Sequence, residues 1–438
     1  MTKSSGIASI VIDGKNLALR QGTGVATYAK SLCANLKQLN KRVEILYGEP
    51  IEVSSNPNEA AVNFFDTSSP RQRLPWLVRS TARVARQCTQ PFRTIVPREL
   101  PFASSSISAQ QLARLPAADR FWNARDVFDM PGFAIERGYF QKVRNVMGAD
   151  SAHWTYPIPV RLDDAFNIYT LHDLVPLKLP HTTLDNKRRY YAMIKKIVET
   201  ASLITTVSEQ SKQDIHALFS VPDARVVNTY QDVDLDAAML KQSQDEVAEA
   251  LSGVLGLEFG KYFLFYGAIE PKKNVGRLIE AHLGSSLDLP LVLVGKDGWL
   301  VDGELQLYSQ HLQRRIGPQR VIRLPYVSRE QLINLIRGAC AVTFPSLYEG
   351  FGLPLVEAMV CGTPVLTSNI GAMKEVAGEA ALFVDPYDVS SIRDGLRRMA
   401  YNRPLQDELR LAGGERALHF SSERYRKRLL AAYASATC

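Results

Sequence analysis

Short apolar runs alternate with helical patterns along most of this chain, and that alternation constrains the fold more than any other feature. In the first half the strand-like runs are IASIVI, VEILY, AVNFF, FNIYTL, LITTV and RVVNTY. A second series begins near Lys261 with YFLFYG, LPLVLVG, RVIRLPYV, CAVTFP, TPVLTS and ALFVDP. Strands that alternate with helices are typical of doubly wound parallel sheets. The sequence therefore predicts an α/β protein.

The two series of runs are separated by KQSQDEVAEALSGVLGLEFG, which has no strand pattern. We therefore place a domain boundary between residues 238 and 258. This boundary predicts two Rossmann-like doubly wound parallel-sheet domains that face a cleft, residues 1–240 and 258–420. The composition suits such domains, since 46% of the 438 residues are hydrophobic.

The cysteines and the N-terminus bear on the cellular compartment. The five cysteines are scattered and form no CxxC pair that would favour zinc or a redox couple. The chain begins MTKSSGIASIVIDG, without the apolar region of a signal peptide, and it contains no apolar run long enough to span a bilayer. We expect a cytoplasmic protein.

The stretch Pro345–Glu357, PSLYEGFGLPLVE, places two carboxylates around a glycine loop where a helix begins. The preceding run, Cys340–Phe344, is typical of a short buried strand. Gly350 and Gly352 allow close approach of the backbone, and Pro354 suits a first helical position. Free amides at the start of a helix attract phosphate, so this loop is expected to meet an anion.

The wider segment FPSLYEGFGLPLVEAMVCGTPVLTSNIGAMKEVAG resembles the retaining glycosyltransferases of family 4, whose fold is called GT-B. The family hallmark is two glutamates separated by seven residues, as Glu349 and Glu357 are. The resemblance implies that Glu349 positions the transferred sugar and that Glu357 accepts hydrogen bonds from the ribose hydroxyls. A helix-capping role is the alternative for Glu357. The loop amides that would meet the sugar and phosphates belong to Gly350, Phe351, Gly352 and Leu353.

The segment YGAIEPKKNVGRLIEA places two adjacent lysines after a predicted strand. An isolated lysine pair is usually solvated. The resemblance implies instead that Lys273, which precedes an asparagine, binds the donor diphosphate and stabilises the leaving group. Gly267 opens this loop. Ala268 stands where many relatives have an arginine, so we expect Lys273, Arg277 or Lys296 to supply that charge.

Two segments of the first half belong to the expected site. His172 and Asp173 end the strand-like run of NIYTLHDLVPLKLP, and the resemblance places such a pair close to the sugar ring and the reaction centre. Gly22 and Gly24 resemble the first glycine loop of the family, which lies near a substrate phosphate. Thr27 stands where a dinucleotide fingerprint has its third glycine, which argues against an NAD-dependent oxidoreductase. The resemblance further implies that the last helix, within residues 421–438, crosses back to the N-terminal domain.

The resemblance also predicts a donor and a reaction. TLHDLVPLKLP, GKDGW and PSLYEGFGLPLVEAM look most like bacterial mannosyltransferases of O-antigen or exopolysaccharide synthesis, so GDP-mannose is the expected donor. The base is expected near Tyr326 and Val327, where Pro325 replaces the usual glycine. The leaving diphosphate would accept the proton of the acceptor on one face, so Glu349 is not expected to act as a nucleophile. The alternatives are UDP-sugar or GDP-deoxysugar donors, or a nucleotide-sugar-binding assembly protein without turnover.

A possible metal-binding element lies elsewhere in the chain. Asp232-Val233-Asp234 is a DxD sequence, which another class of glycosyltransferases uses to hold a divalent cation. It lies at the end of the N-terminal domain, far in sequence from the two glutamates. We therefore expect no metal ion and no cofactor apart from the nucleotide-sugar co-substrate.

A basic segment bears on the acceptor. Between Arg71 and Arg98 there are seven arginines and no acidic residue, with Arg79, Arg83 and Arg86 at helical spacing. Such a helix can rest on anionic lipid headgroups, which suits a polyprenyl-diphosphate-linked acceptor and peripheral contact with the inner membrane. A solvated helix packed on its own domain is the alternative. No recognised nucleic-acid-binding module accompanies the patch, so no nucleic-acid partner is expected.

Overall fold

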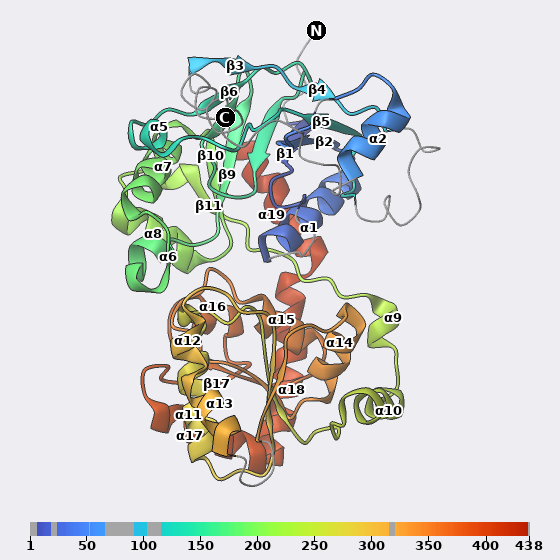
Figure 1. Ribbon diagram of the computed structural model, residues 1–438, viewed down its shortest axis with the longest axis vertical. Helices are drawn as coiled ribbons and strands as arrows, with labels where there is room; N and C mark the ends of the chain where they lie inside the picture. Colours follow the sequence, from blue (N-terminus) through green and yellow to red (C-terminus); the bar gives the residue numbers. More distant parts are fainter. Residues whose placement is uncertain are drawn as a thin grey trace.

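The computed structural model describes residues 7–18, 24–51, 53–65, 92–102, 115–314 and 320–436. The chain forms two α/β domains, one above the other in Figure 1, and each is built around a largely parallel sheet covered by helices. This is the predicted class, with two Rossmann-like parallel-sheet domains.

The N-terminal domain contains a large sheet and a small one. The strands are β1 (Ser9–Asp13), β2 (Arg42–Tyr47), β3 (Thr94–Ile95), β4 (Arg98–Glu99), β5 (Arg120–Asn123), β6 (Gln141–Val143), β7 (Ser151–Trp154), β8 (Val160–Leu162), β9 (Phe166–Leu171), β10 (Leu203–Thr206) and β11 (Val226–Asn228). The large sheet has the order β11-β10-β9-β7-β1-β2-β5-β4, and its pairs are parallel except β4 with β5. The small sheet has the order β3-β6-β8. Because parallel strands end at one edge, the loops after β1, β7 and β9 lie together.

The helices of the N-terminal domain cover the large sheet. They are α1 (Gly24–Gln38), α2 (Pro57–Phe65), α5 (Gly132–Glu136), α6 (Val175–Lys178), η2 (Pro180–Thr182), α7 (Lys187–Thr200), α8 (Glu209–Leu218) and η3 (Asp223–Arg225). One strand prediction in this domain is wrong, because AVNFF forms the end of α2. Pro57 suits the first turn of that helix, and burial of Ala60 and Ala61 with exposure of Val62 gives the one-sided burial of a helix.

Three strands of the large sheet, β4, β5 and β7, carry no apolar pattern and were not predicted. β7 has the sequence SAHW, and its Ser151 and His153 are fully buried. In β5, Trp122 Nε1 donates to a buried carboxylate of β2, Glu44 Oε2, at 2.7 Å. Polar side chains that find partners inside a sheet can be buried without an apolar alternation in the sequence.

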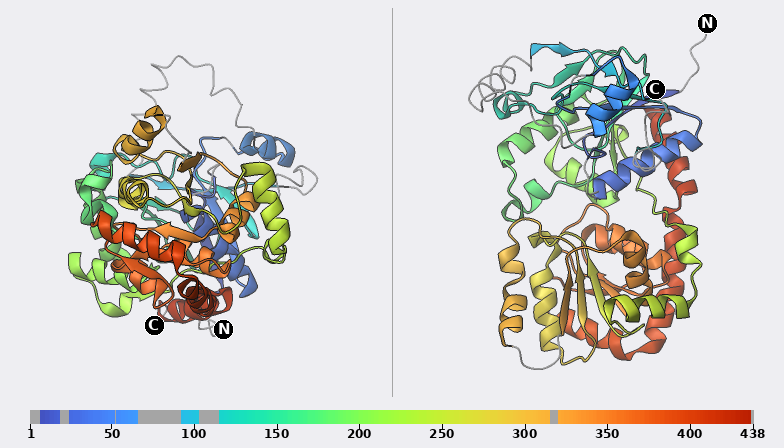
Figure 2. Two further views of the ribbon diagram at one scale, coloured as in Figure 1. Left: turned by 90° about the horizontal axis from the view of Figure 1, so that it is seen from below. Right: turned by 45° about the vertical axis from the view of Figure 1, so that its right-hand side comes forward.

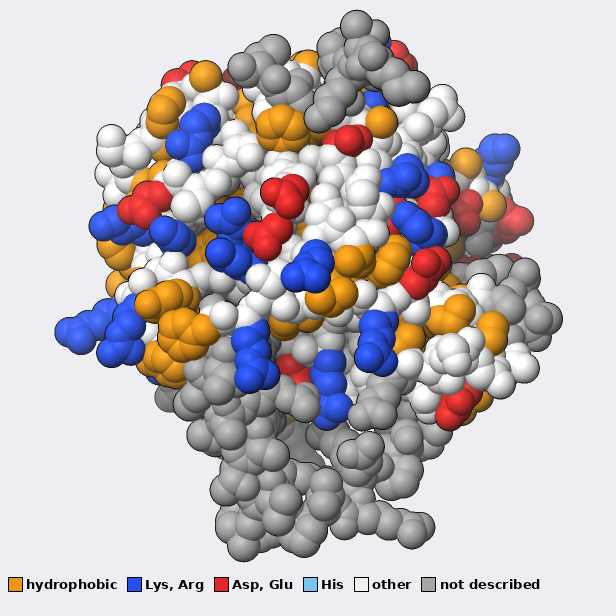
Figure 3. Space-filling view, turned by 90° about the horizontal axis from the view of Figure 1, so that it is seen from above, with side chains coloured by type: hydrophobic (Ala, Val, Ile, Leu, Met, Phe, Trp, Pro, Cys, Tyr) orange, Lys and Arg blue, Asp and Glu red, His pale blue; other side chains and the backbone are white. Residues whose placement is uncertain are grey.

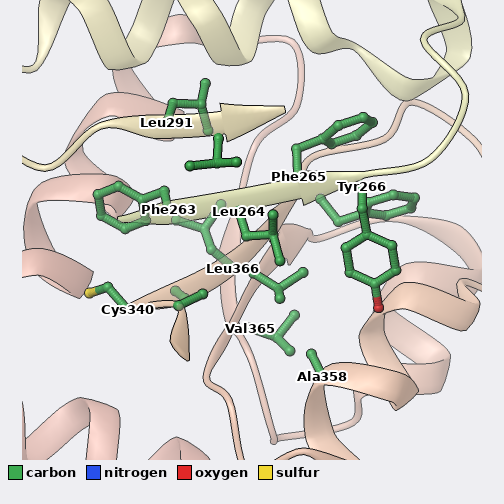
Figure 4. Close-up of a cluster of buried hydrophobic side chains, with 14 of the residues drawn as sticks. Phe263, Leu264, Phe265, Tyr266, Leu291, Cys340, Ala358, Val365 and Leu366 are labelled. Atoms are coloured by element: carbon green, nitrogen blue, oxygen red, sulfur yellow. The ribbon is translucent and has the colours of Figure 1, made fainter. Parts of the chain in front are cut away.

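The C-terminal domain is built on a sheet whose described strand pairs are all parallel. The strands are β12 (Phe263–Tyr266), β13 (Leu291–Val294), β14 (Val321–Leu324), β15 (Ala341–Phe344), β16 (Val365–Ser368) and β17 (Leu382–Val384), in the order β14-β13-β12-β15-β16-β17. All the runs predicted for this half form these strands. Figure 4 shows side chains of β12 packed with those of neighbouring strands and of the helix that carries Ala358.

The helices of the C-terminal domain begin before the predicted start of the domain at residue 258. They are α9 (Ala237–Leu240), α10 (Gln244–Leu255), η4 (Pro271–Lys273), α11 (Val275–Gly284), α12 (Val301–Glu304), α13 (Gln306–Arg314), α14 (Arg329–Gly338), α15 (Leu353–Val360), α16 (Gly371–Ala377), α17 (Val389–Tyr401), α18 (Arg403–Ala417) and η5 (Leu418–Phe420). A capping box of Ser243 and Glu246 starts α10. Val247 and Leu251 of α10 lie in the C-terminal core, so this helix belongs to the C-terminal domain.

The last helix, α19 (Ser422–Ser435), leaves the C-terminal domain and packs on the N-terminal one. Tyr425, Leu429 and Tyr433 of α19 are buried in one cluster with side chains of α1 and β1. The right-hand view of Figure 2 shows this helix in red beside the N-terminal domain. The chain therefore passes between the domains twice, once after β11 and once before α19.

Most of the basic segment between Arg71 and Arg98 lies outside the described residues, and of its arginines Arg93 and Arg98 are described. Figure 3 views the N-terminal domain from above and shows lysine and arginine side chains among acidic ones on this face. Within the described ranges, no helix has the length and apolarity needed to cross a bilayer.

A buried polar network at the centre of the large sheet connects it to α19. His153 Nδ1 lies 2.6 Å from Tyr433 Oη, and His153 Nε2 lies 2.7 Å from Thr170 Oγ1. Thr170 Oγ1 lies 2.9 Å from Tyr28 Oη. Burial lowers the pKa of His153 to about 3, so its imidazole is neutral in the folded protein.

We expect His153 to make stability depend on pH. An unfolded histidine binds a proton below about pH 6.5, whereas folded His153 stays neutral down to about pH 3. The unfolded state therefore binds more protons in this window, and stability falls as pH falls, by about 2 kcal/mol between pH 7 and pH 5. Urea unfolding at these two pH values should show a smaller difference for His153→Gln. Substitution of the exposed His181 by Gln is the control, and an equal pH dependence in both variants would contradict the assignment.

Candidate active site

Several predicted site residues lie in loops at the carboxyl ends of strands, in the large N-terminal sheet and in the C-terminal sheet. His172 and Asp173 directly follow β9, while Lys272 and Lys273 follow β12 in the turn η4. Glu349 lies in the loop between β15 and α15. Open parallel sheets bind their ligands at this edge.

Charged side chains from the two domains meet in one cluster, formed by Asp173, Lys272, Lys273 and Glu349. Lys273 Nζ is 2.5 Å from Glu349 Oε1. Lys272 Nζ is 3.4 Å from Glu349 Oε2 and 3.8 Å from Asp173 Oδ2. The side chains of Lys272, Lys273 and Glu349 are no more than 15% exposed. Lys272, which the sequence did not single out, thus connects the carboxylates of the two domains.

Burial and ion pairing have opposite effects on these groups. Burial raises the pKa of Glu349. Lys272 and Lys273 lower this pKa by more than burial raises it, so it lies below its usual range. Burial lowers the pKa of Lys272, but Glu349, Asp173 and Glu270 outweigh that effect and raise it overall. Glu349 and Lys272 are therefore both charged at neutral pH.

Glu270 is a second buried carboxylate beside this cluster. Within the described part of the chain, its Oε2 has no hydrogen-bond partner. Burial raises its pKa, although Lys272 and Lys273 act in the opposite direction. Nothing in the sequence distinguishes Glu270, because a glutamate in a charged loop is usually solvated.

His172 is held by hydrogen bonding and by ring packing. Its Nε2 donates to the backbone carbonyl of Thr155 at 2.9 Å. Its ring meets the ring of Tyr28 edge-on, with centroids 4.8 Å apart. Burial lowers the pKa of His172, which favours the neutral imidazole. With the proton on Nε2, Nδ1 is the nitrogen that can accept a hydrogen bond from a substrate hydroxyl.

The glycine loop after Glu349 brings the two domains into direct contact. A Cβ atom on Gly350 would lie 2.2 Å from the carbonyl oxygen of His172, so a side chain there would separate the domains. Gly352 has φ +100°, a left-handed conformation that favours glycine, and it precedes the first turn of α15. A Cβ atom on Gly24 would lie 3.7 Å from Leu353 Cδ1, so the start of α1 faces this loop. Phe351 is buried, and its ring packs edge-on against Phe420.

Glu357 lies in α15 with its carboxylate hydrogen-bonded to two other elements. Tyr266 Oη donates to Glu357 Oε2 at 2.9 Å, and Arg329 Nη2 donates to Glu357 Oε1 at 2.7 Å. The N-cap of α15 is Gly352, and the side-chain bonds of Glu357 go to Tyr266 and Arg329, not to the first amides of the helix, which argues against the helix-capping alternative. Arg329 was not predicted, because its link to Glu357 joins α14 to α15 across the domain.

Comparison with known proteins identifies the family. Residues 251–416 match the family described as glycosyl transferases group 1. O-antigen chain mannosyltransferase B of Escherichia coli is 32% identical over 281 residues, which are 63% of this chain and 71% of that protein. The chain belongs to the group 1 glycosyl transferases. Serotype-specific mannosyltransferase WbdA of Escherichia coli is 28% identical over 278 residues. These residues are 61% of this chain and 33% of WbdA.

Solved structures show that this group 1 glycosyl transferase has the GT-B fold. Sucrose-phosphate synthase from Thermosynechococcus elongatus has a TM-score of 0.62 and 17% identity, with 96% of this chain and 97% of that chain covered. WaaG, a glycosyltransferase involved in lipopolysaccharide biosynthesis, has a TM-score of 0.59 and 13% identity, with 97% and 99% covered. Identities this low show the fold alone.

Other residues predicted for the glycosyl transferase site lie around its edge. Gly267 has φ +139°, and its carbonyl oxygen would lie 2.0 Å from a Cβ atom on Gly295, so the loops after β12 and β13 touch there. Lys296 is exposed, and its carbonyl accepts from Ile269 N at 3.1 Å. Tyr326 is exposed and Val327 is half-buried. Gly22 lies outside the described residues.

A second ammonium group, that of Lys272, lies beside Lys273 at the carboxylate of Glu349. Arg277, one of the predicted sources, donates from Nη1 to Asn274 Oδ1 at 2.9 Å, and its guanidinium lies 6.0 Å from the ring centroid of Tyr387. Lys272 instead contacts Glu349 directly. Adjacent lysines in a loop can point in different directions, so the sequence could not show that both ammonium groups reach one carboxylate.

Asp232 of the DxD sequence has structural hydrogen bonds. Its Oδ2 accepts from Asn35 Nδ2 at 2.9 Å and from Ser422 Oγ at 2.8 Å, and its Oδ1 accepts from Ser31 Oγ. These bonds join α1 to the start of α19. Within the described residues, no group of three or more His, Cys, Asp or Glu side chains is arranged to hold a metal ion.

Proposed function

We propose that this glycosyltransferase moves a mannosyl group from GDP-mannose onto a glycan or lipid-linked saccharide in surface-polysaccharide synthesis, with retention of anomeric configuration. The observation that carries the proposal is the buried cluster of Asp173, Lys272, Lys273 and Glu349 where the two domains meet. The choice of mannose is supported by similarity to O-antigen chain mannosyltransferase B.

In the proposed reaction, the donor diphosphate binds at the start of α15 beside the two lysines. The helix amides and both ammonium groups stabilise the charge that develops when the sugar–phosphate bond breaks. The leaving phosphate oxygen takes the proton from the acceptor hydroxyl on the same face of the sugar. No protein base and no metal ion is required in this scheme.

Glu349 is proposed to position the sugar once its carboxylate exchanges its lysine partners for sugar hydroxyls. Lys273 Nζ lies 2.5 Å from the carboxylate of Glu349. A bound diphosphate competes for the two lysines, and Glu349 then accepts hydrogen bonds from sugar hydroxyls. Neutral His172 is proposed to accept a hydroxyl hydrogen bond at Nδ1, with Asp173 beside it.

The nucleoside is proposed to bind along α15 and the loop after β14. The ribose hydroxyls donate to Glu357, whose oxygens are oriented by Tyr266 and Arg329. The base lies near Tyr326 and Val327. Hydrogen bonds from both ribose hydroxyls to this buried carboxylate would favour a nucleotide over a bare phosphate.

The acceptor proposal rests on the sequence of the basic segment. Its seven arginines, from Arg71 to Arg98, have no neighbouring acidic residue in that stretch. Such a segment attracts anionic lipid, which suits a cytoplasmic enzyme in peripheral contact with the inner membrane and a polyprenyl-diphosphate-linked acceptor.

Thermal stabilisation by nucleotides is the first test of this function. GDP, UDP, ADP and NAD are added at matched concentrations, and a nucleotide at a hundred times its Kd should stabilise the protein by about 2.7 kcal/mol. Selective stabilisation by GDP, followed by release of GDP from GDP-mannose with an acceptor, is the expected result. Selective stabilisation by UDP would overturn the donor, and stabilisation by NAD alone would overturn the proposed reaction.

A further inference from the structure

Helix α8 of the N-terminal domain contacts both sides of the proposed reaction centre. Ser211 Oγ donates to the carbonyl oxygen of His172 at 2.7 Å and lies 3.4 Å from the carbonyl oxygen of Gly350. Ser211 is 1% exposed, and its backbone N–H donates to Ser208 Oγ, the cap of α8. One buried hydroxyl therefore lies between the His172 backbone and the loop that carries Glu349.

Tyr348, the residue before Glu349, makes the second contact with α8. Tyr348 Oη donates to Asp214 Oδ2 at 2.5 Å. Asp214 is 2% exposed, and its Oδ1 lies 2.8 Å from Lys178 Nζ and 3.2 Å from Gln210 Nε2. Lys178 and Gln210 of the N-terminal domain thus hold the Asp214 carboxylate in place. That carboxylate accepts the hydrogen bond from Tyr348 of the C-terminal domain.

Glu375 of α16 holds the start of α8 from the C-terminal side. Its Oε1 accepts from Glu209 N at 2.7 Å, and its Oε2 accepts from Gln210 N at 2.9 Å. The first amides of a helix have no partner within the helix, and a carboxylate is favoured at that end. Helix α8 is therefore bonded to the C-terminal domain near its start and again at Asp214.

We propose that Tyr348 and Asp214 are positioning residues, which hold Glu349 at its working distance from His172 through α8. The inference rests on the proposed sugar transfer at this site. Gly350 packs on the carbonyl of His172 with no room for a side chain, so the loop is confined in one direction. The bond from Tyr348 to Asp214 confines it in another. Displacement of a reacting group by about 1 Å can cost roughly a hundredfold in rate.

Tyr348→Phe tests the proposal because it removes the hydroxyl alone. The kcat for sugar transfer should fall about tenfold, as expected for loss of a hydrogen bond to a charged acceptor. The Kd for GDP should be unchanged, and the ratio of donor hydrolysis to transfer should rise, because the nucleotide pocket is intact while Glu349 is misaligned. Tyr401→Phe is the matched control, since Tyr401 is 73% exposed in the same domain. An unchanged kcat, or an equal loss in GDP affinity, would overturn the proposal.

Variants of Asp214 separate positioning from a general effect on folding. Asp214→Ala should lower kcat at least as far as Tyr348→Phe, and the double variant should be no slower than Asp214→Ala, because both changes break one bond. Asp214→Asn keeps an oxygen that can accept the bond, so it should recover much of the activity. Losses that multiply in the double variant, or that track the unfolded fraction, would count against positioning.

Hydrogen exchange gives a readout that does not depend on the donor. Residues 208–218 and 346–353 should exchange faster in Tyr348→Phe than in the wild type and the Tyr401→Phe control. Unchanged exchange in both segments would overturn the coupling through α8. Failure of the wild type to turn over GDP-mannose would instead refute the proposed donor, and kcat would then be measured with the nucleotide sugar that it does use.

Discussion

Glu349→Gln is expected to lower kcat for sugar transfer by about a hundredfold or more, the usual effect of removing one preorganised electrostatic contact. Glutamine keeps the shape of the side chain but removes the charge beside Lys272 and Lys273. Glu349 is paired with these lysines, at 2.5 Å from Lys273 Nζ, so its charge is expected to compete with that of a diphosphate for them. Affinity for GDP should therefore stay the same or increase while turnover falls.

The experiment compares GDP release during transfer with GDP binding measured by thermal stabilisation. Glu408→Gln, at an exposed position of α18, is the control for loss of one negative charge. An equal loss of kcat and GDP affinity in Glu349→Gln would contradict the role in sugar positioning. Full activity would remove Glu349 from the reaction altogether.

The C-terminal sheet could be predicted from the sequence because its strands are buried on both faces. Runs such as Phe263–Tyr266 and Leu291–Val294 are continuously apolar, which is typical of the inner strands of a parallel sheet. The N-terminal sheet was harder to predict. Its β7 buries Ser151 and His153, and the imidazole of His153 is tolerated because both ring nitrogens have hydrogen-bond partners, among them Tyr433 from the far end of the chain.

The sequence could predict those site residues that lie in loops after recognisable strands, because such loops meet at one edge of a parallel sheet. His172 directly follows a recognisable strand, Lys273 and Glu349 lie in the loops after two others, and the structure brings them to the same edge. The contacts of Lys272 and Arg329 could not be predicted in this way. Their partners depend on how the loops fold, and nothing local distinguishes either residue from an ordinary solvated charge.

The contacts across the domain interface were also beyond sequence reasoning. Tyr348 reaches Asp214, which lies 134 positions away, and Glu375 reaches the start of α8, 166 positions from Glu209. Such pairs follow from the way the two sheets face each other. A single sequence records the residues but not their relative placement.

Lys273→Ala is expected to weaken GDP binding by about tenfold to a hundredfold, the usual effect of losing one charge-assisted hydrogen bond. Lys272→Ala should have a smaller effect on GDP but should also lower kcat. Lys272 lies between Asp173 and Glu349, so its removal leaves carboxylates of the two domains facing each other without their shared cation. Repulsion between them opposes the contact of the two domains on which transfer depends.

Thermal stabilisation by GDP and the kcat of transfer are measured for both single variants and for the double variant. Lys261→Ala is the control, because Lys261 is exposed and precedes β12 at the end of the strand away from the site. We expect the double variant to lose most GDP binding, since a diphosphate would then have only the helix amides as partners. Unchanged GDP affinity in Lys273→Ala would count against a diphosphate at this position. If Lys272→Ala binds GDP as tightly as the wild type but has a lower kcat, Lys272 acts in domain alignment alone.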